Sequence, residues 1–516
     1  FSLSRNKEKA NRLTNPIRAL AVAVLAGAMG LSGCAAQQQR SQAESFNAAW
    51  VQGDYSAAAK AMEASSTLTG SEKPEDKQLL ELMHQAEAHR LAGDTALAIS
   101  LYDRAEAGMK LDDTTGLAAG LLEGGTALLV NDAERDYTPM LAETVLVNTY
   151  KGLAFLEQGD RDSARVEFNR SDDRTRRAAE TFAEEIAAQQ EAMANEDNKK
   201  QKAIQRSLES DDMQQSIVAN YSEISQWSVY PEFIVPFATY LHGLFFLASG
   251  ETGDLERASV SLKRVAEMAP KNRALAGDVE LAKSLAAGKR RRDELGQQVW
   301  VLYENGLGPV AEETRFDVPL LLFHGNATSP AYTGIALPRY ADRQAVSKPL
   351  TLRDASGEAI TPEAFSSMGK VIHTEMQERF PAVLARAVAS ATVKALIQNA
   401  AADEMGAAGQ IGAAIFAAAT TQADLRSWQA IPSHWEIARL ADPDTGELTL
   451  GAGGTTLGRI SLPDWPYTLV YIKRPSVQSP MQVSLIDLQG QHAGKRVSLQ
   501  NLPSGGDAPE MVADVD

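Results

Sequence analysis

The chain has 516 residues, a formal net charge of -17 at pH 7 and an apolar content of 44%. This length allows two or three domains, and the apolar fraction is that of proteins with ordinary packed cores. The acidic balance argues against nucleic acid as a partner, because phosphates are bound by clustered lysine and arginine.

The N-terminal segment is built like a secretory signal, with a basic start, an apolar run from Ala19 to Leu31 and small residues before Cys34. It ends in Leu31-Ser32-Gly33-Cys34, which resembles the lipobox of bacterial lipoproteins. In that family the cysteine is acylated on sulfur and becomes the new N-terminus. The resemblance implies that residues 1–33 are a removed signal peptide, that Cys34 carries the lipid, and that residues 34–45 form a polar tether to the membrane.

A transmembrane anchor with an incidental cysteine is the alternative. A span needs about 20 apolar residues, and the run from Ala19 to Leu31 is shorter. Ala35 follows Cys34, where an aspartate would retain an enteric lipoprotein in the inner membrane. The resemblance therefore implies the periplasmic face of the outer membrane, with the inner membrane as the alternative. This cysteine is the only one in the chain, so no disulfide is expected.

A pattern of small residues recurs four times between residues 46 and 290. Each copy has Gly-Asp, an alanine five residues after the glycine, and a larger apolar residue nine after it. Gly-Asp lets the chain leave one helix and cap the next, and the alanine lets two helices approach closely. The pairs are Gly53 and Ala58, Gly93 and Ala98, Gly159 and Ala164, and Gly253 and Ala258.

This spacing resembles the second half of the tetratricopeptide repeat, a helix-turn-helix unit that stacks into a solenoid. Residues 46–290 are therefore expected to form a helical repeat domain. The glycines are unevenly spaced, unlike the regular repeat of the family, and a degenerate unit is expected around residues 115–137. An antiparallel helical bundle is the alternative, because its turns also favour Gly-Asp. The resemblance implies a concave face that binds a protein partner.

Residues 172–220 interrupt the repeats with a stretch dense in charged residues, glutamine and alanine, without glycine or proline. This composition predicts long solvated helices, and a coiled coil that binds a partner is the alternative. The next stretch, residues 227–246, is apolar and aromatic. It predicts a helix of the hydrophobic core rather than an aromatic ligand-binding site.

A second domain is predicted for residues 295–500, because the pattern there changes from helical to strand-like. Residues 365–396 predict a helix, with Pro381 as a kink or break. The alanine- and glycine-rich residues 400–421 predict a tightly packed helical hairpin, with a membrane-inserting glycine zipper as the alternative. The acidic residues 501–516 predict a disordered tail. Strands are expected at 299–303, 316–323, 332–336, 349–352, 468–473, 481–487 and 496–499.

Three segments of this second domain look like an uncharacterised family of bacterial repeat-containing lipoproteins. They are residues 299–306, 336–340 and 426–432. Members of the family are often encoded beside lipoprotein activators of penicillin-binding proteins. The resemblance implies a place in the cell envelope and no particular activity.

No HExxH, Walker or Gly-x-Ser-x-Gly motif is present, so no catalytic residue, metal site or cofactor is expected. The best candidate cluster is His324 with His373-x-Glu375 and His434-x-Glu436. A carboxylate near a histidine could perform general acid and base catalysis. Surface or structural histidines are the simpler interpretation, because nothing in the sequence brings these residues together.

The sequence therefore predicts an α+β protein and leaves two functional hypotheses. In the first, a lipid-anchored helical solenoid is a scaffold or activator that binds an envelope protein, in envelope or cell-wall assembly. In the second, the C-terminal domain is an enzyme or ligand-binding module that acts on cell-wall material. The second hypothesis predicts polar groups that converge in a concave pocket.

Overall fold

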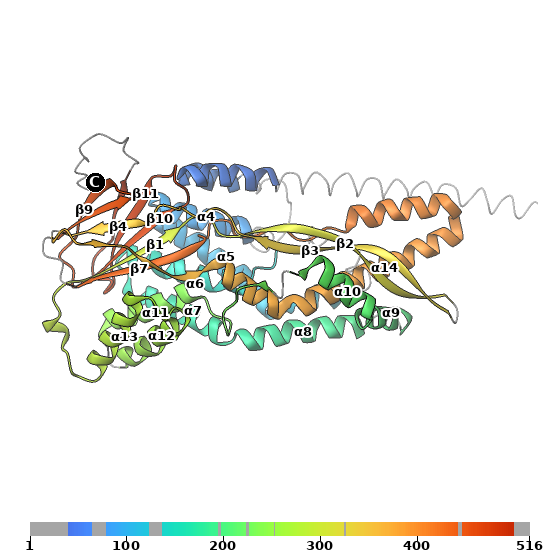
Figure 1. Cartoon of the computed structure of the whole chain (residues 1–516), viewed down its shortest axis with the longest axis horizontal. Coiled ribbons are helices and arrows are strands. Elements are labelled where there is room, and N and C mark those ends of the chain that lie inside the picture. Colours follow the sequence, from blue (N-terminus) through green and yellow to red (C-terminus); the bar gives the residue numbers. More distant parts are fainter. Residues whose placement is uncertain are drawn as a thin grey trace, which may run out of the picture.

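The computed structural model describes residues 40–63, 79–122, 137–194, 198–222, 226–251, 253–324, 327–354, 356–441 and 446–499. These residues form an elongated α+β protein with a broad body at one end and a narrow arm at the other (Figure 1). The predicted signal peptide, Cys34 and the predicted acidic tail lie outside the described residues. The predicted α+β class is confirmed.

One layer of the body consists of helices that pack against one another in chain order. They form antiparallel pairs, and each pair packs against the pair that follows it in the sequence. The pairs are helix 40–52 with α2 (Tyr55–Glu63), α4 (Leu79–Ala92) with α5 (Thr95–Leu122), α6 (Leu141–Glu157) with α7 (Arg161–Arg176), and α11 (Pro236–Ser249) with α12 (Asp254–Met268), followed by α13 (Arg273–Ala286).

The four Gly-Asp pairs of the sequence stand at the turns within these helix pairs. Each glycine has a positive φ, as at Gly53 (74°) and Gly93 (101°), a conformation that L-residues with a side chain rarely adopt. In three copies the aspartate caps the second helix, and Asp54 Oδ1, for example, accepts the N–H of Ala57 at 2.9 Å. The alanines five residues after the glycines are all buried: Ala58, Ala98, Ala164 and Ala258.

Two helix pairs approach closely because a glycine on one helix faces a large side chain on the other. A β-carbon on Gly152 would lie 3.0 Å from the Phe168 ring, and one on Gly243 would lie 2.9 Å from Leu262 Cγ. Backbone and side chain thus interlock without room for a methyl group, which fixes the distance between the paired helices.

Substituting Gly243→Ala is expected to destabilise the protein by about 1–3 kcal/mol, because the new methyl group overpacks the contact with Leu262. Thermal unfolding followed by circular dichroism measures the effect. The matched control is Gly277→Ala in α13, where the nearest atom to the added carbon is Arg439 Nη1 at 3.4 Å. There the gain in helix propensity should leave stability unchanged or slightly raised. Equal losses in the two variants would contradict the prediction.

A six-stranded sheet forms the middle layer of the body. Its central strands β1 and β10 run parallel, and the other neighbouring strands run antiparallel. Every residue of these two strands is buried, because helices cover one face of the sheet and a second sheet covers the other. The strand order is β12 (Lys495–Leu499), β11 (Met481–Asp487), β10 (Tyr467–Arg474), β1 (Gln298–Asn305), β7 (His434–Ala441) and β6 (Glu363–Ser367).

The second sheet is smaller and forms the third layer. Alternate residues of β1, such as Val299 and Val301, pack against its leucines, whereas Trp300 and Leu302 face the helices. The largest core therefore contains residues from both sides of the domain boundary predicted near residue 295. The strand order is β5 (Ala359–Ile360), β4 (Leu350–Arg353), β8 (Glu447–Ala452) and β9 (Thr455–Ser461).

Three of the Gly-Asp turns abut the C-terminal sheet. A β-carbon on Gly53 would lie 2.8 Å from Pro480, in the β10–β11 loop. One on Gly159 would lie 3.2 Å from the backbone of His492, in the β11–β12 loop. One on Gly93 would lie 4.0 Å from Arg496 of β12. The helix pairs are thus held at their turns by the strands of the same chain.

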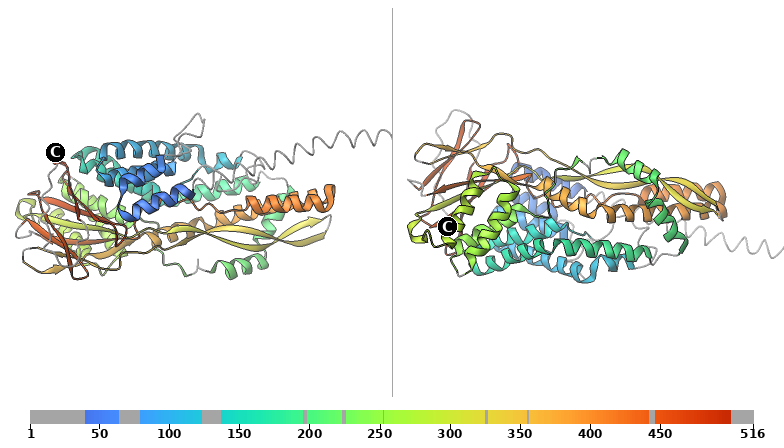
Figure 2. Two further views of the ribbon diagram at one scale, coloured as in Figure 1. Left: turned by 90° about the horizontal axis from the view of Figure 1, so that it is seen from above. Right: turned by 60° about the horizontal axis from the view of Figure 1, so that its bottom comes forward.

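The arm extends from the body along the long axis (Figures 1 and 2). Two long antiparallel strands run its length, and helices pack beside them. The arm has its own apolar core, which contains Met213, Val318 and Val388 among others. Its elements are β2 (Val310–His324), β3 (Ala327–Ala341), α14 (Met368–Thr420), α8 (Ala178–Ala194), α9 (Asn198–Leu208) and α10 (Asp211–Asn220).

Residues 172–220 are largely helical, and most of the described side chains in α8, α9 and α10 are exposed or half-buried. In addition, α9 and α10 pack on β2 and bury Ile204, Met213 and Ile217, a contact that was not predicted. A few apolar residues suffice there, since each helix covers only one side of a narrow hairpin. The apolar stretch 227–246 is core as predicted, with Phe237 and Tyr240 fully buried.

Other boundaries also shift. Residues 40–45 are helical, so the polar tether can comprise at most residues 34–39. Residues 363–367 form strand β6, and α14 begins only at Met368 and continues through Pro381. Strands β8 and β9 were not predicted. The turn between β7 and β8 lies partly outside the described residues. The degenerate repeat unit expected at residues 115–137 also lies partly outside them.

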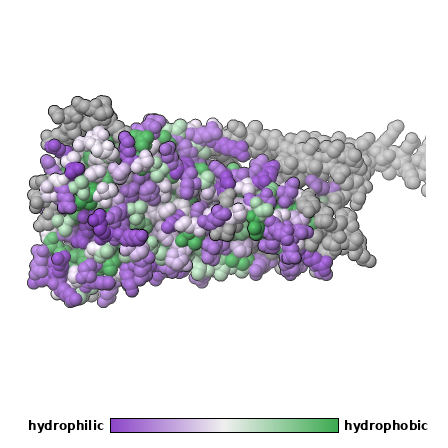
Figure 3. Space-filling view, viewed as in Figure 1, coloured by the Kyte–Doolittle hydropathy of each residue, from purple (hydrophilic) through white to green (hydrophobic). Residues whose placement is uncertain are grey.

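The visible face of the molecule is mostly hydrophilic, with apolar residues scattered over it (Figure 3). Within the described part of the chain, no helix combines the length and hydropathy that crossing a bilayer would require.

Candidate functional site

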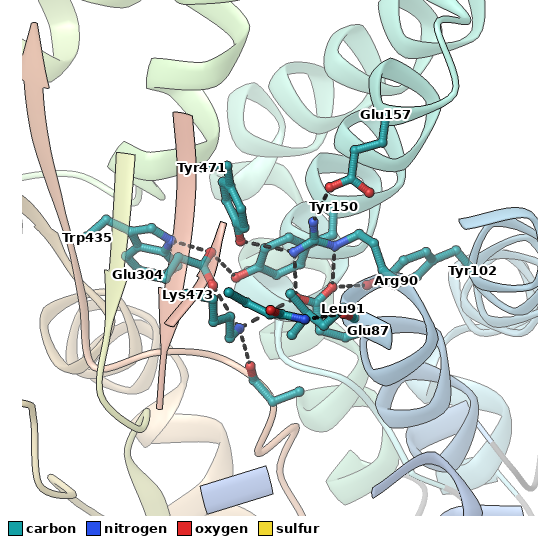
Figure 4. Close-up of polar contacts among 12 residues, drawn as sticks. Glu87, Arg90, Leu91, Tyr102, Tyr150, Glu157, Glu304, Trp435, Tyr471 and Lys473 are labelled. Carbon is teal, nitrogen blue, oxygen red and sulfur yellow. Dashed lines mark hydrogen bonds and ion pairs between the residues drawn. The ribbon is translucent and has the colours of Figure 1, made fainter. Parts of the chain in front are cut away.

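The most concentrated group of charged and polar side chains lies where the helices meet the six-stranded sheet (Figure 4). We term it the junction cluster. Its members come from six elements that are far apart in the sequence, and all of them are buried. They are Glu87 and Arg90 of α4, Tyr102 of α5, Tyr150 and Glu157 of α6, Glu304 of β1, Trp435 of β7, and Tyr471 and Lys473 of β10.

Arg90 is the centre of the helical half of this cluster. Its Nε and Nη2 donate to the two carboxylate oxygens of Glu87, both at 2.8 Å, in a bidentate pair. Nη1 donates to Glu157 Oε1 at 3.1 Å and Nη2 to the Tyr471 hydroxyl at 3.0 Å. The guanidinium also lies over the rings of Tyr150 and Tyr471. One side chain thereby links α4, α6 and β10.

Lys473 and Glu304 form the half of the cluster that belongs to the sheet. Lys473 Nζ lies 2.7 Å from Glu304 Oε2 and donates to the carbonyl oxygen of Ala430 at 2.8 Å. Glu304 Oε1 accepts hydrogen bonds from the Tyr150 hydroxyl at 2.8 Å and Trp435 Nε1 at 2.7 Å. Every one of these groups thus has a partner of opposite charge or complementary polarity.

The electrostatics of the cluster keep its charges in place. Burial alone would raise the pKa of Glu87, but the charges of Arg90 and Lys473 outweigh it and hold this pKa below the usual range. Burial raises the pKa of the Tyr102 and Tyr150 hydroxyls far above their usual values, so both remain neutral donors. A proton shuttle needs a group that titrates near neutral pH and can reach its substrate. The junction cluster instead fastens helices to sheet.

A second charged group joins three helices around the buried Lys151 of α6. Its Nζ lies 2.6 Å from Asp103, 2.9 Å from Glu106 and 3.0 Å from Glu167. Arg170 completes the group with contacts to Glu106 and Glu167. Burial opposes the charge of Lys151, yet these carboxylates raise its pKa above the usual value. The ammonium lies between the three acids, and Lys151 and Arg170 together offset two of their three negative charges.

A third group fastens the arm to the body through Glu375 of α14. Its two oxygens accept the backbone N–H groups of Leu141 at 2.6 Å and Ala142 at 2.9 Å, at the N-terminus of α6. Arg379 donates to Glu375 at 3.0 Å and forms a bidentate pair with Glu185 of α8. Burial raises the pKa of Glu375 to about 7, although Arg379 and both backbone donors favour the carboxylate.

The predicted histidine and carboxylate candidates are not brought into one site. The ring of His373 stacks on Trp227, and Glu375 caps α6 as described. His434 Nε2 lies 2.9 Å from Glu436, which also accepts a hydrogen bond from Asn305. His324 ends the 15-residue strand β2, whose length of about 48 Å carries it to the far end of the arm.

The junction cluster was not predicted from the sequence, although two of its strands carry a usable signal. Glu304 and Lys473 each end a run of apolar, strand-forming residues. A charge at the end of a fully buried strand requires a buried counter-charge, because isolated ions are too costly to desolvate. Such a signal predicts that a partner exists, but it does not say that Arg90 and Glu87 are nearby.

The described residues define an α+β protein in which the charged groups of the junction cluster are paired with one another. Among the described residues, no three His, Cys, Asp or Glu side chains are grouped so that they could hold a metal ion. Comparisons of the chain with protein-family models, curated proteins and solved structures found no match.

Proposed function

We propose that this protein is a lipid-anchored scaffold of the bacterial outer membrane that faces the periplasm and binds an envelope protein. The observation that carries the proposal is that the charged groups of the junction cluster are paired with one another inside the protein. Its acids and bases are paired with one another and buried, which suits a rigid link between two layers better than a reaction centre. The lipobox ending at Cys34 supports the place in the envelope.

The finer proposal is that the helix pairs are a solenoid of tetratricopeptide-like repeats. Its support is that the pairs follow one another in space as in sequence, and that the same offsets from each glycine are buried. The residues nine after the glycines are all buried: Met62, Tyr102, Phe168 and Leu262.

The sheet of the same chain already occupies one face of the helices, so we place the partner on the outward side of the second helices. The residue seven after each glycine is exposed in all four pairs, and in two of them it is a valine. Val166 and Val260 are 47% and 69% exposed, and they are two of the five large apolar residues that are exposed in the described part of the chain. These exposed positions are Lys60, Ser100, Val166 and Val260.

Replacing Cys34 with alanine is expected to remove the acylated N-terminus and reduce the protein in the outer-membrane fraction at least tenfold. Several acyl chains hold a protein firmly to a bilayer, whereas a chain without them has no such anchor. Mass spectrometry of the N-terminal peptide and membrane fractionation are the measurements. An unprocessed, unmodified N-terminus in the unaltered chain would overturn the lipoprotein proposal.

The partner surface is tested in the same cells with the full chain, because truncation near residue 290 would expose the shared core. Partners captured from detergent extracts should be lost when Val166 and Val260 are both replaced by glutamate. The matched control is Val218→Glu, an equally exposed valine on α10 of the arm. Loss of the same partners in the control alone would place the binding surface on the arm.

A further inference from the structure

We infer that the protein partner of the proposed scaffold presents an acidic segment to helix α13, an inference that rests on the proposed function. The first observation is a local reversal of charge. Residues 254–297, which form α12, α13 and the loop to β1, contain ten Lys and Arg against seven Asp and Glu. The whole chain contains 50 and 67 of these residues. The two helices therefore carry basic charge in an acidic protein.

Most of the seven acids in this region do not offset its exposed cations. Two acids are buried, and three form ion pairs with Lys263 or Arg291. Within the described part of the chain, two exposed acids without an ion pair remain, one on each helix. The buried acids are Asp254 and Asp278, the paired ones are Glu267, Asp293 and Glu294, and the remaining ones are Glu256 and Glu280.

Four cations along α13 form the second observation, and we term them the basic row. All four side chains are exposed, and no described carboxylate lies within ion-pair distance of them. Lys271 precedes the helix and Lys283 lies in its last turn, so the two are about 18 Å apart along the axis. An extended chain of about five or six residues has this length. The members of the basic row are Lys271, Lys283, Lys289 and Arg290.

The fold does not need these cations as helix caps. Cations are favourable at the C-terminus of a helix, where carbonyl groups lack partners. At the end of α13 the backbone supplies those partners, since the carbonyl oxygen of Ser284 accepts the N–H groups of Lys289 at 2.9 Å and Arg290 at 3.3 Å. At the end of α11 the side chain of Arg292 donates to the carbonyl oxygen of Ala248 at 3.0 Å. The side chains of the basic row therefore remain available to a partner.

The position of α13 favours an acidic protein over anionic lipid. Helix α13 lies at the end of the body that is opposite the arm (Figure 1). Helix 40–52 runs along the long axis, with Val51 bonded to the β10–β11 loop and Asn47 bonded to Arg343, just after β3 of the arm. Its first residues therefore point toward the arm. With Cys34 acylated a few residues earlier, the membrane lies on the arm side and the basic row faces away from it.

Screening makes the local charge decisive. At physiological ionic strength an exposed charge acts over about 8 Å, so the acids on other parts of the molecule offset the basic row only weakly. Helix α13 also packs on α12, which carries the exposed Val260 of the proposed partner surface. An acidic segment next to an apolar contact residue thus matches the chemistry of these two helices.

Fluorescence anisotropy with a labelled peptide of about ten glutamates tests the basic row. The chain that begins at Ala35 keeps every described residue, and it should bind the peptide at low salt and release it at high salt. The triple variant Lys271→Gln, Lys283→Gln, Lys289→Gln should bind at least fivefold more weakly. The matched control removes three exposed cations near the second sheet and should bind like the parent: Lys348→Gln, Arg353→Gln, Arg459→Gln. No binding by the parent, or equal losses in the two variants, would overturn the inference.

Arginine at the same three positions separates charge from side-chain shape. Lys271→Arg, Lys283→Arg, Lys289→Arg keeps the three charges and should retain the binding that the glutamine variant loses. Circular dichroism of each variant checks that the fold is kept. Binding to phosphatidylglycerol vesicles or to isolated cell wall, with none to the glutamate peptide, would refute the acidic protein segment.

Capture of partners in cells distinguishes this inference from the proposed function. Partners that the unaltered full chain captures should be lost from the triple glutamine variant and kept by its matched control. If the double glutamate variant at Val166 and Val260 loses partners that the triple glutamine variant keeps, the proposed function stands and the inference fails. If the double glutamate variant keeps every partner while the glutamate peptide still binds the basic row, the proposed surface on the second helices fails instead.

Discussion

Replacing Arg90 with methionine is expected to lower the free energy of unfolding by about 3–5 kcal/mol. The substitution leaves Glu87 and Glu157 buried without the guanidinium that neutralises both, and it breaks the link to the Tyr471 hydroxyl. Removing one partner of a buried ion pair costs more than the pair itself contributes, because the remaining charge stays desolvated. Urea unfolding followed by tryptophan fluorescence and circular dichroism measures the loss.

The matched control is Arg290→Met, because Arg290 is exposed after α13. Its loss should change the free energy of unfolding by no more than about 0.5 kcal/mol. A second variant, Arg90→Lys, keeps the charge but not the bidentate geometry or the stacking on two rings, so it should fall between the two. An effect of Arg90→Met as small as that of the control would show that the junction cluster does not join the layers.

The free energy of unfolding is expected to fall by about 3 kcal/mol between pH 5 and pH 8 through Glu375, since its folded-state pKa is about 7 and its usual value is 4.5. Between these values the folded protein holds a proton that the unfolded chain has released. Stability therefore decreases as pH rises through this window, and the penalty is complete above pH 7. Urea unfolding at pH 5, 6, 7 and 8 measures the slope.

The variant Glu375→Gln isolates this contribution, because glutamine does not titrate. It should flatten the dependence most clearly between pH 6 and pH 7, where Glu375 still titrates in the folded protein and Asp278 contributes little. Asp278, which accepts hydrogen bonds from Tyr240 and Trp300, has a pKa raised by burial to about 6. Its contribution lies mainly below pH 6 and should persist in the variant. Identical slopes in the parent and the variant would contradict the assignment to Glu375.

Local chemistry explains which parts of the fold could be predicted. A Gly-Asp turn, a buried alanine and a larger buried apolar residue lie within ten residues of one another, so the helix pairs could be predicted from the sequence. Strands such as β1 and β10 are buried on both faces and appear as continuous apolar runs. Strands β8 and β9 were not predicted, because both are short and contain glycine and charged residues that weaken the strand pattern.

Non-local contacts explain what could not be predicted. Glu375 is a candidate in the sequence because it lies two residues from His373, and a carboxylate near a histidine can take part in general acid and base catalysis. Its role depends instead on the N-terminus of α6, more than 200 positions earlier in the chain. Likewise, Arg90 and Tyr471 meet only because two layers pack face to face. No spacing rule within a segment describes such pairs.

The docking of Gly53, Gly93 and Gly159 against particular loops and strands of the C-terminal sheet has a consequence for how this protein can evolve. Arrays of stacked helical hairpins commonly gain or lose copies by duplication, since each unit touches only its neighbours. Here a duplicated pair would move every later turn away from the loop it meets. The copy number is thereby frozen, and length variation among descendants should accumulate in the projecting segments instead.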